Sequence, residues 1–198
     1  MNHISIEGMD GVGKSTTCKL LAGKLGYIFV EKPLHYLLDD SEDEIKQYQK
    51  VAKRVNSNPN RDFTAWYYGL NNIYLYEKFK DQNIVTDRHI VSNYCWSGTD
   101  YNDDIYDLII KKIGKPNITV ILYANPDVIM QRLKKRDIND SDIYKVSKSE
   151  KAYERMIYFC EYKNLKYIVV DTSYKNPEDI VNEIINKLKE LNVIDGNQ

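Results

Sequence analysis

Long hydrophobic runs, paired cysteines and an excess of charge of either sign are all missing from this 198-residue chain. No apolar stretch approaches the ~20 residues that span a bilayer, and an apolar run begins at His3, so we expect neither a membrane span nor a signal peptide. Cys18, Cys95 and Cys160 are widely spaced and form no C-x-x-C pair, which is typical of reduced thiols in a cytoplasmic protein. Lysine and arginine total 28 against 29 aspartates and glutamates, so the composition favours binding to neither nucleic acid nor membranes.

Glycine and proline are also scarce, at nine and five residues, and no stretch rich in them marks a linker. A chain of this length without an internal repeat suits one domain with a sizeable core, so we predict a single domain over residues 1–198. Short apolar runs alternate with longer helical patterns, which favours a doubly wound α/β fold with a five-stranded parallel sheet. The predicted strands are 3–7, 27–30, 83–86, 118–123 and 167–170, and the predicted helices are 14–25, 41–56, 63–80, 101–113, 126–135, 148–164 and 177–191.

The chain does contain a phosphate-binding loop, because residues 8–15 read GMDGVGKS and fit the pattern G-x-x-x-x-G-K-[ST]. A predicted strand precedes the motif and a predicted helix follows it, which is the context that the motif requires. Its glycines let backbone N–H groups surround phosphate oxygens, and the helix directs its partly positive N-terminus at the same anion. Lys14 can reach the β- and γ-phosphates and the Ser15 hydroxyl can bind Mg²⁺, so we predict ATP and Mg²⁺ as cofactors. The predicted donor-binding residues are Gly8, Asp10, Gly11, Val12, Gly13, Lys14, Ser15, Thr16 and, from a later loop, Thr172.

Ligands of such sheets bind at the carboxyl ends of the strands, where Asp87-Arg88-His89 follows one apolar run and Asp171-Thr172-Ser173 follows another. Asp87 can hold Mg²⁺ through water or orient a nucleophile, and Arg88 can neutralise charge on a transferring phosphoryl group. The alternative for this pair is an ordinary surface ion pair. No cation adjoins Asp171, so Thr172 and Ser173 are expected to line the nucleotide base. The histidines are isolated and lack metal-ligand spacing, so we assign them no metal.

A basic cluster of Arg132, Lys134, Lys135 and Arg136 ends the helix predicted over 126–135. Cations are favoured near any helix C-terminus, so one interpretation is a solvated helix end. The other is a basic lid over about residues 134–148, because the polar stretch that follows is typical of a loop that closes over phosphates and excludes water. The candidate catalytic residues are therefore Lys14, Asp87, Arg88, Arg132 and Arg136.

An aromatic stripe recurs at three- and four-residue spacing on the helix predicted over 63–80. One interpretation is that the stripe faces the core, as stripes with this period commonly do. The other is that its N-terminal part stacks on a nucleobase, and both can hold for different rings. The members of the stripe are Phe63, Trp66, Tyr67, Leu70 and Tyr74.

The segment IEGMDGVGKST at residues 6–16 resembles the opening of the thymidylate kinases, and Asp87-Arg88-His89, followed by Ser92 and Gly98, is similar to a second segment of that family. Pro33 and the runs 132–136 and 171–173 fall at further positions typical of the family, so the resemblance spans nearly the whole chain. It implies a P-loop kinase fold with a short helical lid, and transfer of the ATP γ-phosphoryl group to a nucleoside monophosphate. It also implies a homodimer.

By this resemblance, Lys14 and Ser15 serve the donor phosphates and Mg²⁺, Asp10 approaches the acceptor sugar, and Arg88 bridges the acceptor phosphate and the transferring group. Because the loop has Val12 and no arginine, the resemblance assigns the catalytic arginine to the lid, at Arg132 or Arg136. The predicted acceptor-binding residues are Asp10, Glu31, Lys32, Phe63, Trp66, Tyr67, Arg88 and Trp96, and the predicted metal ligands are Ser15 and Asp87.

Two departures from the family concern the acceptor. Thymidylate kinases carry an arginine where this chain has Glu31, and another on the helix near Phe63, where residues 63–75 contain none. Both arginines would hold the acceptor phosphate, and Lys32 or Arg61 can substitute for them. Three functions therefore stay open: a dTMP kinase, a deoxynucleoside kinase that uses Glu31 as general base, and a nucleotide-dependent switch without phosphotransfer. We favour the first, because a lid and an aromatic wall suit a second substrate pocket that a switch does not need.

Overall fold

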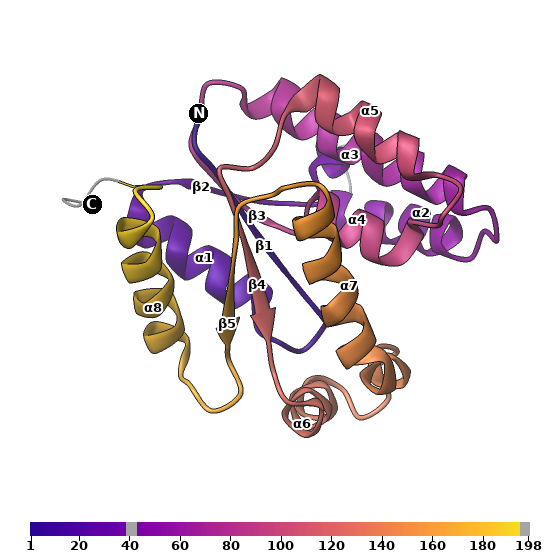
Figure 1. The fold of residues 1–198 in the computed structure, drawn as a ribbon. Helices are drawn as coiled ribbons and strands as arrows, with labels where there is room; N and C mark the ends of the chain where they lie inside the picture. Colours follow the sequence, from indigo (N-terminus) through magenta and orange to yellow (C-terminus); the bar gives the residue numbers. More distant parts are fainter. Residues whose placement is uncertain (39–42, 195–198) are drawn as a thin grey trace.

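The computed structural model describes residues 1–38 and 43–194. Its centre is a five-stranded sheet in the order β2-β3-β1-β4-β5, in which every neighbouring pair of strands runs parallel. The predicted doubly wound α/β fold is therefore confirmed (Figure 1). The strands are β1 (His3–Gly8), β2 (Ile28–Glu31), β3 (Ile84–Asp87), β4 (Ile118–Tyr123) and β5 (Tyr167–Asp171).

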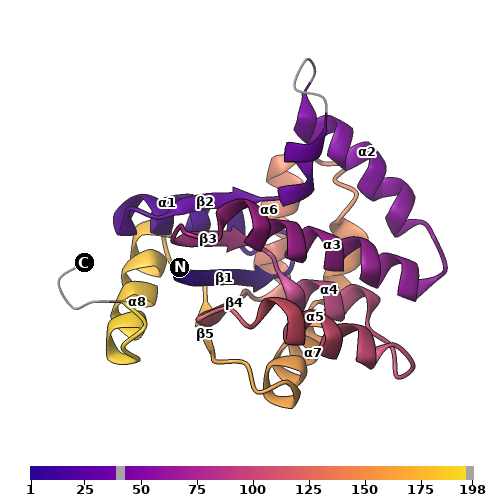
Figure 2. The same ribbon diagram turned by 90° about the horizontal axis from the view of Figure 1, so that it is seen from above.

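Helices cover both faces of this sheet. They are α1 (Lys14–Leu25), η1 (Pro33–Leu37), α2 (Glu44–Asn56), α3 (Arg61–Phe79), α4 (Ile90–Ser97), α5 (Asp103–Ile113), α6 (Pro126–Arg136), η2 (Ile143–Lys148), α7 (Ser149–Tyr162) and α8 (Pro177–Glu190). Figures 1 and 2 show α1 and α8 on one face and α3, α4, α5 and α7 on the other. All six residues of β1 are buried, as expected for a central strand that is covered on both sides.

The seven predicted helices are present, and the one predicted over 41–56 is observed from Glu44 because residues 39–42 lie outside the described ones. The sequence did not predict α4. Seven of its eight residues are buried, so it lacks the polar face on which a prediction from periodicity depends. This helix matters for the site because it starts directly after the Asp87-Arg88-His89 segment.

The main apolar core has an aromatic centre between α4, α5 and α7. The rings of Tyr94 and Phe159 stack with their centroids 4.3 Å apart, and Tyr106 meets Phe159 edge-on at 5.7 Å. Such pairs add specific ring geometry to the burial of a large apolar area. The three cysteines are also buried and unpaired, in accord with the prediction of reduced thiols.

The parallel register brings the carboxyl ends of four strands together at one end of the sheet. Ile6 of β1 and Glu31 of β2 both pair with Asp87 of β3, and Gly8 pairs with Leu122 of β4. The phosphate-binding loop therefore lies beside Asp87 at the end where Figure 1 also places α6.

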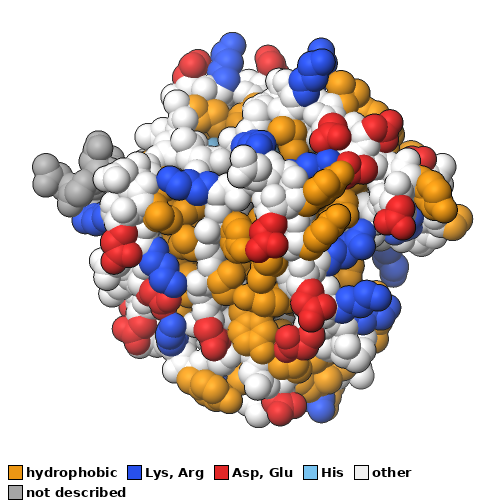
Figure 3. All heavy atoms as spheres, viewed as in Figure 1, with side chains coloured by type: hydrophobic (Ala, Val, Ile, Leu, Met, Phe, Trp, Pro, Cys, Tyr) orange, Lys and Arg blue, Asp and Glu red, His pale blue; other side chains and the backbone are white. Residues whose placement is uncertain are grey.

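Within residues 1–38 and 43–194, none of the helices combines the length and the apolar character that crossing a bilayer requires. Charged side chains of both signs are interspersed on the face that Figure 3 shows.

Replacement of the fully buried Phe159 by alanine tests the aromatic centre. We expect Phe159→Ala to lower the free energy of unfolding by about 3–5 kcal/mol, because it removes apolar burial and leaves a cavity between Tyr94 and Tyr106. Tyr158→Ala is the control, since this neighbouring ring is 53% exposed and its loss is expected to cost less than about 1 kcal/mol. Urea unfolding followed by circular dichroism measures both, and equal losses for the two variants would contradict this view of the core.

Candidate functional site

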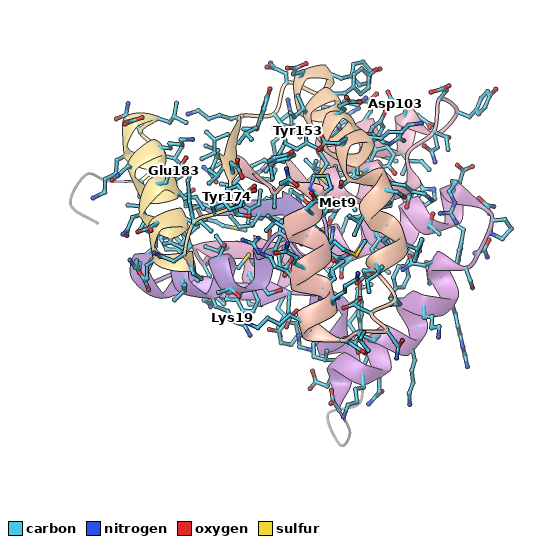
Figure 4. All side chains as sticks on the ribbon, turned by 90° about the horizontal axis from the view of Figure 1, so that it is seen from below. Met9, Lys19, Asp103, Tyr153, Tyr174 and Glu183 are labelled. Atoms are coloured by element: carbon cyan, nitrogen blue, oxygen red, sulfur yellow. The ribbon has the colours of Figure 1, made fainter. Side chains whose placement is uncertain are left out.

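The phosphate-binding loop depends on glycine at its first position. Gly8 ends β1 with a φ of 141°, and a Cβ atom there would lie 2.6 Å from the carbonyl oxygen of Leu122. Helix α6 also packs closely against the loop at Gly11, where a Cβ atom would lie 3.1 Å from the side chain of Ile129. A larger residue at either position would move the backbone that surrounds a phosphate. Figure 4 looks onto this end of the sheet, with Met9 in the loop, Lys19 on α1 and Tyr174 in the segment before α8.

Lys14 and Ser15 open α1 at the end of this loop. The Nζ of Lys14 donates to the carbonyl oxygen of Met9 at 2.7 Å and lies 3.7 Å from Asp10 Oδ1. Burial lowers the pKa of the Lys14 ammonium, and Arg88 lowers it further. The hydroxyl of Ser15 donates to Asp87 Oδ2 at 2.5 Å. A helix N-terminus, a lysine and an adjacent hydroxyl–carboxylate pair thus meet at one point.

The segment after β3 turns sharply at Arg88, which has a left-handed φ of 74°. Its NH1 donates to the Gly8 carbonyl and to Ser92 Oγ, each at 3.1 Å, and its NH2 donates to Asp10 Oδ1 at 2.6 Å. Burial opposes the charged guanidinium, but the surrounding carboxylates of Asp10, Asp87 and Glu7 raise the pKa of Arg88. Asp87 and Arg88 are therefore part of the loop site and not an isolated surface ion pair.

Glu7 is a buried carboxylate that sequence reasoning missed. It accepts hydrogen bonds from the backbone N–H of His89 at 2.8 Å, from Ser5 Oγ at 3.0 Å and from Ser92 Oγ. Burial raises the pKa of Glu7, whereas these donors and Arg88 lower it. Ser92 Oγ accepts a hydrogen bond from Arg88 and donates one to Glu7, so the Glu7 carboxylate holds the turn at Arg88 through Ser92 and the His89 N–H. A glutamate at the end of a strand whose six residues are all buried, directly before the phosphate-binding loop, was the signal that could have identified it.

His89 points into the protein and not toward the loop. Its ring lies 4.8 Å from that of His3 and 5.6 Å from that of Tyr76, measured between centroids. Neither ring nitrogen has a hydrogen-bond partner among the described residues, and burial lowers the pKa of His89 to about 3. The neutral ring is therefore part of the packing beneath the site.

Asp10 is the electrostatic centre of the arrangement. Besides Arg88 at 2.6 Å, it lies 3.7 Å from Lys14 and 3.6 Å from Lys145 of η2. Burial alone would raise the pKa of this carboxyl, but the three cations outweigh burial and hold the pKa well below its usual range. Asp10 is therefore ionised and joins the loop, the Arg88 turn and η2.

The two arginines expected to act from the lid have other partners. Arg136 donates to Asp140 at 2.5 Å and to Asp142 at 3.0 Å, so its guanidinium is held within the segment that follows α6. Arg132 donates to the Thr172 carbonyl at 2.6 Å and, at 3.4 Å, to the carbonyl of Gly11. It therefore supports the back of the loop.

The side chain of Thr172, a residue expected to line the donor base, is directed at the back of the phosphate-binding loop. This residue is fully buried, and its hydroxyl donates to the carbonyl oxygens of Val12 and Tyr123 at 2.9 and 3.0 Å. Thr172 thus fastens the segment after β5 to the loop. Ser173 Oγ donates to Asp171 at 2.6 Å, so it too is engaged locally.

The aromatic stripe on α3 is oriented differently from the expectation. Phe63 and Trp66 are 47% and 44% exposed, on the opposite side of α3 from Tyr68, because each residue advances a helix by about 100°. Tyr68 points to that opposite side, where its hydroxyl donates to Asn56 Oδ1 of α2 at 2.8 Å. Burial raises the pKa of Tyr68, while Arg88 and Lys145 lower it. Tyr67 meets Tyr48 of α2 at 6.4 Å between ring centroids. Phe63 and Trp66 therefore lie on the exposed face of α3, and their contact with a nucleobase stays a prediction.

Trp96, by contrast, lies beside the site, because the ammonium of Lys145 is 5.9 Å from its ring centroid.

Glu31 and Lys32 at the end of β2 form an ion pair with each other, and each side chain is about one-third exposed. Lys32 adopts a left-handed φ of 46°, which turns the chain into η1. Arg61 is bonded to the Asn58 carbonyl at the start of α3.

A groove of about 780 Å³ lies between the N-termini of α1 and α8. It begins at Ser15 and Thr16, passes Lys19 and Leu20, and ends against residues 176–179. Its position next to the loop gives room for the part of a ligand that extends beyond the phosphates.

Within residues 1–38 and 43–194, no three side chains of the His, Cys, Asp and Glu types form a metal-binding group. Ser15 and Asp87 suit a different kind of site, because Mg²⁺ commonly takes one or two protein oxygens and completes its shell with phosphates and water.

Comparison with known proteins gives consistent matches over almost the whole chain. The family model described as thymidylate kinase matches residues 6–184. The chain is 26% identical over 193 residues to a "Probable thymidylate kinase" of Methanocaldococcus jannaschii, covering 95% of this chain and 96% of that protein. It is 28% identical over 186 residues to a "Putative adenylate kinase" of Thermococcus kodakarensis, covering 94% and 85%. Among solved structures it is similar to deoxyadenosine kinase from M. mycoides with bound dATP, with a TM-score of 0.65, 22% identity and coverage of 94% and 99%.

The depressed pKa of Asp10 gives a pH-dependent prediction. A carboxyl whose pKa is lower in the folded state stabilises the fold above its ordinary pKa, and this stabilisation is lost as the pH falls. Asp10→Asn is therefore expected to lower the free energy of unfolding by about 1–3 kcal/mol at pH 7, because it leaves three cations without their shared anion. The difference from wild type should shrink as the pH falls below about 4.

Urea unfolding at several pH values measures this effect. Asp104→Asn is the control, because this exposed aspartate in the first turn of α5 is expected to change stability little at any pH. A loss for Asp10→Asn that did not vary with pH would show that the carboxylate charge is not the cause.

Proposed function

This chain belongs to the thymidylate kinase family of nucleotide kinases, and we propose that it transfers the γ-phosphoryl group of ATP to a nucleoside monophosphate, with dTMP as the preferred acceptor. In this reaction a phosphate oxygen of the acceptor forms a bond to the γ-phosphorus, while the bond from that phosphorus to the β–γ bridging oxygen breaks. ADP leaves with the electron pair, and the acceptor oxygen has no proton to lose. Positioning and charge neutralisation are therefore the main demands on the protein.

The position of Arg88 is the observation that carries this proposal. Its guanidinium contacts Gly8 and Asp10 of the phosphate-binding loop and is anchored through Ser92. A fixed cation between the donor loop and the neighbouring strand ends suits an acceptor that itself brings a phosphate. A hydroxyl acceptor carries no charge for it to balance, and a nucleotide switch has no acceptor.

The donor side follows from the loop and the adjoining groove. Lys14 and the α1 N-terminus would bind the β- and γ-phosphates, and the groove past Thr16 and Lys19 has room for the rest of the nucleotide. Ser15 and Asp87, whose oxygens lie 2.5 Å apart, would hold Mg²⁺. The metal would supply charge neutralisation between the phosphates.

The acceptor side is aromatic and basic. Trp96 lies beside Lys145, so a nucleobase can pack against its ring while its phosphate meets Lys145 and Arg88. The ion pair between Glu31 and Lys32 reduces the repulsion that the Glu31 carboxylate alone would exert on a phosphate dianion. This pairing supports a monophosphate acceptor, because it reduces the negative charge that the acceptor phosphate would meet at Glu31.

A deoxynucleoside kinase is the second candidate, because the partly exposed Glu31 carboxylate ends the strand next to Asp87 and could accept a hydroxyl proton. One similar protein is named as a probable thymidylate kinase and another as a putative adenylate kinase, so AMP is a further acceptor to test.

Steady-state rates with dTMP, AMP and thymidine, for wild type and Glu31→Gln, separate these acceptors. We expect dTMP to be the best acceptor and Glu31→Gln to keep its turnover on dTMP within about threefold, because no general base is needed. Lys32→Met is the matched control. It is expected to raise the KM for dTMP, since it leaves the Glu31 charge unbalanced. Faster turnover of thymidine, with Glu31→Gln reduced at least ~100-fold on it, would establish the second candidate instead.

The outward face of α3 is the surface that we propose for a homodimer. Phe63, Trp66, Leu70 and Ile73 share this face at helical spacing and are each more than one-third exposed. A contiguous apolar face on a helix is typical of a contact surface, and a second copy with the same patch can pair with it about a two-fold axis.

Sedimentation velocity tests this assembly. We expect wild type to sediment as a dimer and Leu70→Glu as a monomer, because a charge would have to be buried between two apolar faces. Ile138→Glu is the control, since Ile138 is 76% exposed and lies between α6 and η2, away from α3. A monomeric wild type, or a Leu70→Glu variant that is still dimeric, would rule out this face.

A further inference from the structure

Lys145 lies on η2, a segment in which no sequence motif indicates a role in the site. Its Nζ is 3.6 Å from Asp10 Oδ2 in the phosphate-binding loop and 2.7 Å from Asp142 Oδ1 in its own segment. The same ammonium is 5.9 Å from the ring centroid of Trp96 on α4. Lys145 thus extends from the lid to the centre of the loop.

The other cations of residues 134–148, all of which the structure describes, are placed differently. Arg136 is paired with Asp140 and Asp142, inside the lid. Lys148 lies 5.9 Å from the ring centroid of Tyr144, and Lys134 and Lys135 are exposed on the last turn of α6. Within this segment, Lys145 is the cation that forms an ion pair with the phosphate-binding loop.

We propose that Lys145 is the lid cation that contacts the transferring phosphoryl group, and that Asp10 holds it over the phosphate-binding loop. This inference rests on the proposed function, and it assigns to a lysine of η2 the role that the sequence suggested for Arg132 or Arg136.

The geometry around Asp10 supports this role. Arg88, Lys14 and Lys145 come from three different segments, and each lies within 3.7 Å of the same carboxylate. Three cations this close repel one another and require an anion between them. The equatorial oxygens of a transferring phosphoryl group carry negative charge and can meet the same three groups.

The contact between Lys145 and Asp10 is also suited to exchange. It is longer than the 2.6 Å contact of Arg88, and the Lys145 side chain is 28% exposed. Asp10 can therefore retain Arg88 while Lys145 turns from the carboxylate to a phosphoryl oxygen. As the β–γ bond breaks and the new phosphorus–oxygen bond forms, the ammonium stabilises charge and transfers no proton.

Substitution of Lys145 separates this role from a general effect of lid charge. We expect Lys145→Met to lower kcat by about 100-fold or more while the KM for ATP changes less than about threefold, because the contact strengthens in the transition state. Lys145→Arg is expected to recover at least about a tenth of the lost turnover. Lys148→Met removes the same charge three residues away and is expected to keep kcat within about threefold. Wild-type kcat in Lys145→Met, with a large loss in Arg136→Met, would overturn the proposal.

A second readout does not depend on catalysis. The chain has two tryptophans, and Trp66 lies on the outer face of α3, so a Trp66→Phe background leaves Trp96 as a reporter beside Lys145. Acrylamide quenching of Trp96 is expected to increase by the same factor in Lys145→Met and Asp10→Asn, and to stay unchanged in Lys148→Met.

These outcomes distinguish the two proposals. Quenching in Lys145→Met equal to that of the background would show that Asp10 does not hold Lys145 over the loop, and would overturn the inference even if the enzyme transfers phosphate. A wild-type protein that transfers no phosphoryl group to any nucleotide would refute the proposed function, and with it the catalytic part of this inference.

Discussion

The ion pair between Asp10 and Arg88 is the contact on which the rest of the site depends. It joins the phosphate-binding loop to the turn after β3 at 2.6 Å, and through Asp10 both are linked to Lys145 of the lid. Two unit charges of like sign about 4 Å apart in a partly buried site repel by about 4 kcal/mol, so these cations cannot gather without an anion. One carboxylate thus brings together three segments that are far apart in the chain.

That contact is possible because the backbone beneath it is fixed. The parallel register places Asp87 beside Ile6, and the chain then turns through Arg88 in a left-handed conformation that costs about 1–3 kcal/mol. The hydrogen bonds from His89 N–H and Ser92 to the buried Glu7 offset this strain. The sheet therefore sets the position of the turn, and Glu7 sets the direction of the guanidinium.

Much of this architecture could be predicted from the sequence, because it depends on local patterns. Apolar runs identified all five strands, and the pattern G-x-x-x-x-G-K-[ST] between a predicted strand and a predicted helix identified the loop from Gly8 to Ser15. The short helix α4 could not be predicted in the same way, because burial on nearly all sides removes the periodic signal. The aromatic helix α3 was predicted, but its rotation about its own axis was not, so the sequence did not indicate that Phe63 and Trp66 lie on the exposed face.

The residues of the site that the sequence did not predict share one physical reason for this. Glu7 and Lys145 act through partners 85 and 135 residues away at Ser92 and Asp10, and no spacing rule in one sequence encodes such pairs. Arg136 had the expected residue type and position, yet both of its aspartate partners lie in its own segment. Lys145 shares Asp142 with Arg136 but also forms an ion pair with Asp10 of the loop. Charge alone could therefore suggest a lid, but which cation faces the loop depends on tertiary structure.

The most direct test of the proposed function follows the fate of the phosphate itself. The protein is incubated with ATP labelled in the γ-phosphate and an equimolar mixture of thymidine and dTMP, and the labelled nucleotides are separated during the first turnovers. We expect the label to appear first in the β-phosphate of dTDP, because Arg88 is placed to bind an acceptor phosphate. Label that appears first in dTMP would mean that the acceptor is a sugar hydroxyl, and would contradict the role of the charge cluster around Asp10 in binding an acceptor phosphate.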